Sequence, residues 1–165
     1  MSQDYAHFLK RFRVQEGDRV AENLWRRDVR TGHWQFLSFW DWEWHEPTQT
    51  MREHGSPDVE SLQPVSVEQA NDLEKDRARW FLYWAVYRSE PNPGDEPVNV
   101  ARKRPSPESG RDEIFGTGDE WMRTTKIFDF YSPWPTDPPH LEPVDAAEAE
   151  RILQERRGVT GATSW

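Results

Sequence analysis

The chain contains one short pattern twice, first as Leu62-Gln63-Pro64-Val65-Ser66 and again as Leu141-Glu142-Pro143-Val144-Asp145. In both copies a Pro-Val pair leads to a residue type that commonly caps the start of a helix. Gln69 and Glu148 stand three residues after these caps, which completes a capping box in each copy. Small and apolar side chains then recur at helical spacing. The pattern therefore predicts one helix after each segment.

Further matches precede both helices and keep the same order along the chain. They pair Phe12-Arg13 with Tyr87-Arg88, Gly17-Asp18 with Gly94-Asp95, residues 23–27 with 99–103, Trp34 after Thr31-Gly32 with Trp121 after Thr117-Gly118, and Trp40-Asp41-Trp42 with Phe128-Asp129-Phe130. Five matches in one order indicate an internal duplication. We therefore expect an α+β fold built from a duplicated unit of three to four antiparallel strands followed by one helix. The two units should be related by a pseudo-two-fold axis, with aromatic-rich sheets.

The repeat divides the chain, which we expect to form one pseudo-symmetric domain over residues 1–165. The first repeat covers 1–79, with strands at 12–15, 23–27 and 33–45 and a helix at about 66–79. The second covers 80–158, with strands at 81–88, 98–103, 112–115 and 121–131 and a helix at about 145–157. Residues 159–165 are predicted to be a flexible tail, in which only Trp165 is a candidate for docking.

A short helix is also expected before the first strand. Tyr5, Phe8, Leu9 and Phe12 follow the spacing i, i+3, i+4, i+7, which is the pattern of one apolar face of a helix.

Aromatic residues dominate the apolar composition of the 165-residue chain. Hydrophobic residues make up only 35% of it, but ten residues are Trp and eight are Phe. Each large aromatic side chain can bury about 150–250 Å². The mean hydropathy of -1.02 is low for a folded protein. The tryptophan content nevertheless predicts a folded, aromatic core.

Charge and cysteine content exclude several classes of site and partner. The chain has no cysteine, which rules out disulfides, thiolate zinc sites and cysteine nucleophiles. The net charge of -9 is spread over both halves, which argues against nucleic acid as a partner. The N-terminal residues lack the pattern of a signal peptide, and no apolar run reaches the roughly 18 residues that span a bilayer. We therefore expect no membrane contact and a cytoplasmic location.

The most unusual segment is the aromatic run 34–46, which we predict to be part of a strand. Alternate residues of a strand share a face, so one face would carry Trp34, Phe36, Trp40, Trp42 and Trp44. The favoured interpretation of this face is sheet core, because apolar faces of period two are usually buried. The alternative is a binding surface, either a stacking platform or an aromatic pocket.

The opposite face of the same segment would carry Asp41, Glu43 and His45. These side chains offer oxygen and nitrogen ligands of the kind that bind metals. Alternate strand residues lie roughly 6–7 Å apart, however, so a solvated polar face is the favoured interpretation and no metal site is predicted. Together with Trp34, Trp40, Trp42 and Trp44, these three residues are the candidate binding residues.

The remaining patterns indicate no catalysis. The sequence lacks the metalloprotease, nucleophile-elbow, phosphate-loop and dinucleotide motifs, so we predict no catalytic residues and no cofactor. Two basic clusters, Arg26-Arg27 with Arg30 and Arg102-Lys103-Arg104, occupy matching places in the two repeats. A solvated face is the favoured interpretation, and contact with a phosphate or carboxylate is the alternative.

Three functions remain open. The first is a non-enzymatic protein that binds another protein, for example an acidic inhibitor of the immunity or antitoxin type acting on a basic partner. Two observations favour it: Trp, Tyr and Arg dominate the binding energy of protein interfaces, and acidic surfaces speed association with basic targets. The second is a protein or enzyme that binds a small molecule in a Trp-lined pocket between the repeats. The third is a structural subunit of a larger assembly.

Overall fold

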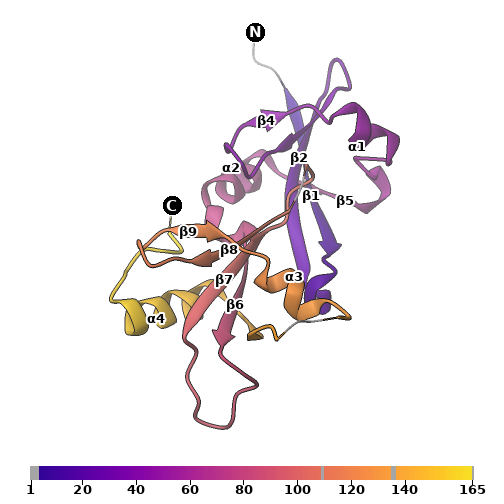
Figure 1. The fold of residues 1–165 in the computed structure, drawn as a ribbon. Helices are drawn as coiled ribbons and strands as arrows, with labels where there is room; N and C mark the ends of the chain where they lie inside the picture. The colour runs from indigo at the N-terminus through magenta and orange to yellow at the C-terminus, as the bar shows by residue number, and fades with distance from the viewer. Residues whose placement is uncertain (1–3, 109, 135–136, 165) are drawn as a thin grey trace.

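The computed structural model describes residues 4–108, 110–134 and 137–164, and its fold is shown in Figure 1. The first half of the chain forms β1 (Tyr5–Arg13), β2 (Val20–Asp28), β3 (Trp34–Leu37), β4 (Trp44–His45), α1 (Gln49–Glu53), β5 (Leu62–Val65) and α2 (Val67–Lys75). The second half forms β6 (Leu82–Tyr87), β7 (Asn99–Arg104), β8 (Arg111–Phe115), β9 (Trp121–Arg123), α3 (Lys126–Tyr131), β10 (His140–Val144) and α4 (Ala146–Arg157). Short 3₁₀ turns lie at Glu16–Asp18, Val59–Ser61 and Arg77–Trp80.

The strands form two antiparallel five-stranded sheets, which confirms the mixed α+β class. The strand orders are β4-β3-β2-β1-β5 and β10-β6-β7-β8-β9. In each half the fifth strand therefore returns to pair with the first, and a short helix precedes it. Pro64 pairs with Phe8 in one sheet and Pro143 pairs with Trp84 in the other. Both prolines lie in edge strands, where a missing N–H costs no ladder hydrogen bond.

Both predicted helices are present and begin at the predicted caps. Ser66 accepts a hydrogen bond from the Gln69 backbone N–H at 3.1 Å, and the Gln69 side chain accepts one from the Ser66 N–H at 3.0 Å. Asp145 accepts a hydrogen bond from the Glu148 N–H at 2.8 Å. The helix α4 ends at Arg157 and is capped by Gly158, whose φ of 67° is the left-handed conformation that glycine adopts without strain. The helix α2 ends at Lys75, earlier than predicted, and the 3₁₀ turn Arg77–Trp80 follows it.

The predicted N-terminal helix is wrong, because residues 5–13 form the strand β1. This strand pairs with β2 on one side and with β5 on the other. Leu9 faces one cluster of apolar side chains and Phe8 faces another, on the opposite side of the sheet. A strand with apolar contacts on both faces needs no strict alternation, so its sequence can match helical spacing by coincidence.

The two longest predicted strands are also wrong. The aromatic segment leaves the sheet after Leu37, turns over residues 38–43 and returns only as the two-residue strand β4. Likewise the segment 121–131 is a strand only to Arg123 and then becomes α3, whose first N–H, that of Lys126, donates to the Thr124 hydroxyl. Short Ser, Thr and Asp side chains bond nearby backbone groups in this way and so compete with strand pairing.

Three of the five matched sequence pairs do not occupy equivalent positions in the sheets. On the register that matches residues 23–27 with 99–103, Phe12 corresponds to Arg88 and not to Tyr87. Trp121 is paired with Phe115 at the place where Trp44 is paired with Leu37, so Trp44 rather than Trp34 is its positional counterpart. The Trp40-Asp41-Trp42 segment forms a turn, whereas Phe128-Asp129-Phe130 lies in α3.

The largest apolar cluster joins the two halves of the chain. It contains Leu9, Leu24 and Leu37 from the first sheet, Ala70 from α2, Phe81, Tyr83, Val100 and Phe115 from the second half, and Ile152 and Leu153 from α4. A second cluster also mixes the halves, with Val14 and Ala21 packed among Trp84, Ala101 and Ile127. A third, around Trp25, Phe36 and Met51, lies on the outer face of the first sheet beside α1.

The predicted flexible tail is held against the body of the protein over residues 159–164. Glu150 of α4 accepts hydrogen bonds from the backbone N–H groups of Gly161 and Thr163 and from the Thr163 hydroxyl. Trp121 Nε1 donates to the carbonyl oxygen of Ala162 at 3.0 Å. Composition alone did not reveal these anchors, which come from residues far away in the sequence. Trp165, the predicted docking residue, lies outside the described residues.

Candidate functional site

Residues 38–43, which we name the Trp40 turn, are held in one conformation by a set of short-range hydrogen bonds. The Ser38 N–H donates to the Glu43 carbonyl at 2.9 Å, and the Trp42 N–H donates to the Ser38 carbonyl at 3.0 Å. Two side chains add further bonds: the Ser38 hydroxyl accepts from the Trp40 N–H at 3.2 Å, and the Asp41 carboxylate accepts from the Glu43 N–H at 3.0 Å. The turn is therefore a defined surface feature rather than a loose loop.

Two aromatic rings anchor the Trp40 turn to the second half of the chain. Phe39 is fully buried and stacks on Trp80 with 5.3 Å between ring centroids. Trp42 adopts a φ of 62°, which is uncommon for a bulky residue, and its ring lies 6.2 Å from that of Phe81. With its neighbours turned inward, Trp40 is left 38% exposed.

The structure does not bring the four candidate tryptophans onto one face. Trp34 packs against Phe8 at 5.1 Å on the outer side of the first sheet. Trp44 lies 6.1 Å from His7 and faces the main core. Because the strand is interrupted at the Trp40 turn, the alternation of a strand no longer relates these positions. Trp40 is the one exposed residue among the four, and the other three are half-buried.

The three polar candidates lie at or beside the Trp40 turn. Asp41, Glu43 and His45 are all exposed, and His45 Nε2 lies 2.8 Å from Asp41 Oδ2. Desolvation raises the pKa of Asp41, but hydrogen bonds from the Glu43 N–H and from His45 outweigh it and lower this pKa below its ordinary value. Within the described ranges, no group of three or more His, Asp or Glu side chains is arranged to hold a metal ion.

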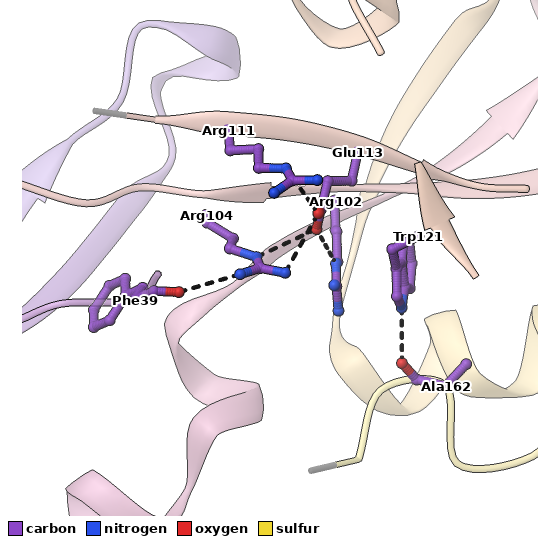
Figure 2. Close-up of polar contacts among 7 residues, drawn as sticks. All are labelled: Phe39, Arg102, Arg104, Arg111, Glu113, Trp121 and Ala162. Carbon is purple, nitrogen blue, oxygen red and sulfur yellow. Dashed lines mark hydrogen bonds and ion pairs between the residues drawn. The ribbon is translucent and has the colours of Figure 1, made fainter. Parts of the chain in front are cut away.

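A buried ionic cluster, which we name the arginine cluster, lies on the second sheet. Three guanidinium groups surround the Glu113 carboxylate (Figure 2): Arg102 Nε at 2.7 Å, Arg111 Nε at 3.0 Å and Arg104 Nε at 3.3 Å. Arg102 and Glu113 are paired across β7 and β8, as are Arg104 and Arg111, so all four side chains share one face. Arg102 and Glu113 are each 1% exposed.

Burial shifts the pKa values of two residues in and beside the cluster. It lowers the pKa of Arg102 to about 10, although the Glu113 carboxylate acts in the opposite direction. Burial also raises the pKa of the neighbouring Tyr83 to about 12. The interpretation of Arg102-Lys103-Arg104 as a solvated face is therefore wrong for Arg102. The alternative, contact with a carboxylate, is found here within the chain itself.

The arginine cluster connects the Trp40 turn to the second sheet and to the C-terminal segment. Arg104 Nη1 donates to the carbonyl oxygen of Phe39 at 3.2 Å. The Arg102 guanidinium lies 4.0 Å from the ring centroid of Trp121 and 4.4 Å from that of Phe81. Trp121 in turn holds Ala162, as Figure 2 shows. The position of Trp40 thus depends on charged residues of the other half of the chain.

An open hollow of about 320 Å³ lies where the Trp40 turn meets the second sheet. Its lining comes from both halves of the chain and consists of Trp40, Gly110, Arg111, Asp112, Arg123 and Thr124. The guanidinium carbons of Arg111 and Arg123 lie 5.6 and 5.9 Å from the ring centroid of Trp40. This is a cationic, aromatic concavity on a protein of net charge -9.

Sequence reasoning did not single out Arg111, Glu113 or Arg123, and it named Arg104 only as part of a basic cluster. Arg111 and Glu113 alternate along one strand, as Arg102 and Arg104 do along its neighbour, which could have indicated an ionic cluster. Recognising that these four side chains meet requires the register of β7 against β8, which the sequence does not show. Sequence reasoning also missed two strongly exposed aromatic side chains near α3, Phe128 at 63% and Trp134 at 87%. The prolines around Trp134 do predict a loop, but they do not show how far its side chain is exposed.

Comparison with known proteins finds no match to a family model, to a curated protein or to a solved structure. No helix in the described ranges has the length and apolar character needed to cross a membrane.

Proposed function

We propose that this chain is a non-enzymatic binding protein that recognises another protein through the Trp40 turn. The observation that carries the proposal is the exposed indole of Trp40 between a rigid, hydrogen-bonded backbone and the exposed carboxylates of Asp41 and Glu43. An aromatic side chain held in place loses little conformational entropy on binding, which suits it as an anchor at an interface.

We expect a basic partner because the Trp40 turn itself carries exposed carboxylates, although the hollow beside it is lined by Arg111 and Arg123. Asp41 and Glu43 are exposed, and the chain carries a net charge of -9. Long-range attraction between oppositely charged proteins raises the rate of association, and buried aromatic anchors slow dissociation. An inhibitor of the immunity or antitoxin type would combine these two properties. We expect it to act in the cytoplasm, which cell fractionation tests.

Capture from a lysate of the native host tests the proposal when wild-type protein and matched variants are compared. We expect a basic protein to be retained in stoichiometric amount by the wild type and lost with Trp40→Ala and with the double variant Asp41→Asn, Glu43→Gln. Phe128→Ala, which alters an exposed aromatic side chain of α3, serves as the control. Equal retention by the wild type and by both test variants would contradict the assignment to the Trp40 turn.

A small-molecule binder remains the second candidate, supported by the hollow between Trp40 and the second sheet. The pocket predicted from sequence was lined by several tryptophans, whereas this one has Trp40 together with arginines. The third candidate, a subunit of a larger assembly, is supported by the exposure of Phe128 and Trp134. Loss of capture with Phe128→Ala or Trp134→Ala instead of Trp40→Ala would favour it.

We also infer that the two halves of the chain arose by duplication. Shared element order and shared strand order support this inference, as do the two proline-containing fifth strands with the same register against the first strand. In the duplicated unit, Trp25 would correspond to Ala101 and Phe36 to Ile114. On this correspondence Arg102 and Glu113 would match Arg26 and Gln35, whose side chains are also hydrogen-bonded, with 2.7 Å from Arg26 Nε to Gln35 Oε1.

A further inference from the structure

We propose that the hollow between Trp40, Arg111 and Arg123 binds an oxyanion, either a carboxylate or a phosphate group. The inference is independent of the proposed protein partner, names a ligand class for the hollow that supports the second candidate function, and can be tested on the isolated chain.

The first argument is the balance of charge on one face of the second sheet. Arg102, Arg104 and Arg111 all contact the same carboxylate, that of Glu113. The carboxylate that Arg111 contacts is therefore shared with two other guanidinium groups and compensates the charge of Arg111 only in part. The Arg111 side chain is 27% exposed and lines the hollow, so this charge faces a ligand bound there.

Arg123 adds a fourth positive charge to the same face. It is directly opposite Glu113 in the ladder between β8 and β9, so the two side chains share a side of the sheet. Arg123 is exposed, and among the described residues it makes no ion pair. Its guanidinium is instead placed beside the Trp40 ring.

The acidic residue in the lining does not neutralise this charge. The Asp112 carboxylate lies 3.4 Å from Lys103 Nζ, and the alternation of β8 directs it to the opposite side of the sheet from Arg111 and Glu113. Thr124, also in the lining, already accepts a hydrogen bond from the Lys126 N–H, which leaves its hydroxyl hydrogen available as a donor. Glu113, on the same side of the sheet, contacts Arg111, so Arg123 and the Thr124 hydroxyl are the lining donors that have no carboxylate partner among the described residues.

The geometry suits a small oxyanion. A guanidinium group binds carboxylate or phosphate oxygens through two parallel N–H donors. A volume of about 320 Å³ accommodates inorganic phosphate, or a carboxylate with a ring attached. An attached ring would lie against Trp40, whereas phosphate would contact the two arginines alone.

Thermal unfolding of the intact chain in chloride buffer tests the proposal, with sodium phosphate or sodium benzoate added at constant ionic strength. We expect at least one anion to raise the melting temperature in a saturable way. Arg123→Gln should weaken the apparent affinity by about tenfold or more, since it removes a charge-assisted hydrogen bond. Arg13→Gln, which removes an exposed arginine on β1, should behave as the wild type.

The two anions distinguish the forms of the site. A response to phosphate that survives Trp40→Leu indicates a phosphate site, and a response to benzoate that Trp40→Leu abolishes indicates an aromatic carboxylate site. No saturable response to either anion would overturn the proposal, as would a response of equal size in Arg123→Gln. Arg123 is exposed, so its replacement leaves the fold intact and the comparison valid.

Discussion

At the scale of single residues, Glu113 is the most consequential side chain of the second half. Its carboxylate is the shared partner of Arg102, Arg104 and Arg111. A buried ion pair adds little net stability compared with an apolar core, but the loss of one partner leaves a buried charge without compensation.

We therefore expect Glu113→Gln to lower the free energy of unfolding by about 3–5 kcal/mol. Glu155→Gln, which changes an exposed ion pair on α4, should cost less than about 1 kcal/mol. Urea unfolding of both variants and of the wild type measures the difference. Equal costs for the two substitutions would contradict the central place of Glu113.

A second residue-scale prediction concerns Glu150 and the pH dependence of stability. Desolvation raises its pKa, but hydrogen bonds from Thr163, Gly161 and Ala162 outweigh it and lower the pKa below the ordinary value of 4.5. A carboxyl group with a lowered folded-state pKa contributes stability above its unfolded pKa and loses it as pH falls through the folded pKa. The hydrogen bonds that hold residues 161–163 should therefore weaken in acid.

Glu150→Gln tests this pH dependence. We expect the wild type to be more stable than the variant at neutral pH, and the difference to shrink as pH falls below 4.5. Urea unfolding at a series of pH values measures it. A difference that stays constant or grows in acid would show that the charge of Glu150 does not hold the segment.

At the scale of elements, the two capped helices are bound to their sheets to different extents. Ile152 of α4 is fully buried in the main core, whereas Leu73 of α2 is half-buried and lines an open hollow. We expect Ile152→Ala to cost about 2–4 kcal/mol and Leu73→Ala to cost distinctly less. Denaturant unfolding measures both, and a Leu73→Ala cost equal to or above that of Ile152→Ala would contradict the packing described here.

The same elements show how far sequence could predict the fold. Helix caps are local, and so Ser66 and Asp145 located the start of both helices correctly, although the complete capping box is found only at Ser66. The strand β1 was mistaken for a helix because its apolar residues serve two faces, a property set by neighbours that the local pattern does not contain. The Trp40 turn was mistaken for a strand because its aromatic residues suggested one, while Ser38 and Asp41 set the turn by bonding nearby backbone groups.

The candidate site was predicted only in part, because some of its residues come together only in the folded protein. Trp40, Asp41, Glu43 and His45 were named from the sequence and lie at or beside the Trp40 turn. Arg111 and Arg123 were not, because their proximity to Trp40 depends on how the two sheets meet. Arg111 and Arg123 are far from Trp40 in the sequence, and contacts between such distant segments leave no local pattern.

At the scale of the whole molecule, the two halves share their apolar clusters. The main cluster joins Leu24 and Phe39 to Tyr83 and Ile152, and further contacts cross the same boundary. Arg19 Nη1, for example, donates to the Tyr83 carbonyl at 2.5 Å, and Lys103 Nζ lies 2.7 Å from Glu16 Oε1.

We expect neither residues 1–79 nor residues 80–165 to fold alone, because each would expose the apolar surface that the other covers. Near-ultraviolet circular dichroism should show no fixed aromatic packing in either fragment and a recovered signal when the two are mixed. Cooperative thermal unfolding of one isolated fragment would contradict this expectation.

The central claim is that the Trp40 turn is the recognition surface of the protein. Amide hydrogen exchange of the full chain, with and without the protein that it captures, tests this claim most directly. We predict slower exchange on binding in residues 38–46, with any further protection limited to the adjoining strands β8 and β9. Protection confined to α3 and the loop around Trp134, with the Trp40 turn unchanged, would contradict the claim.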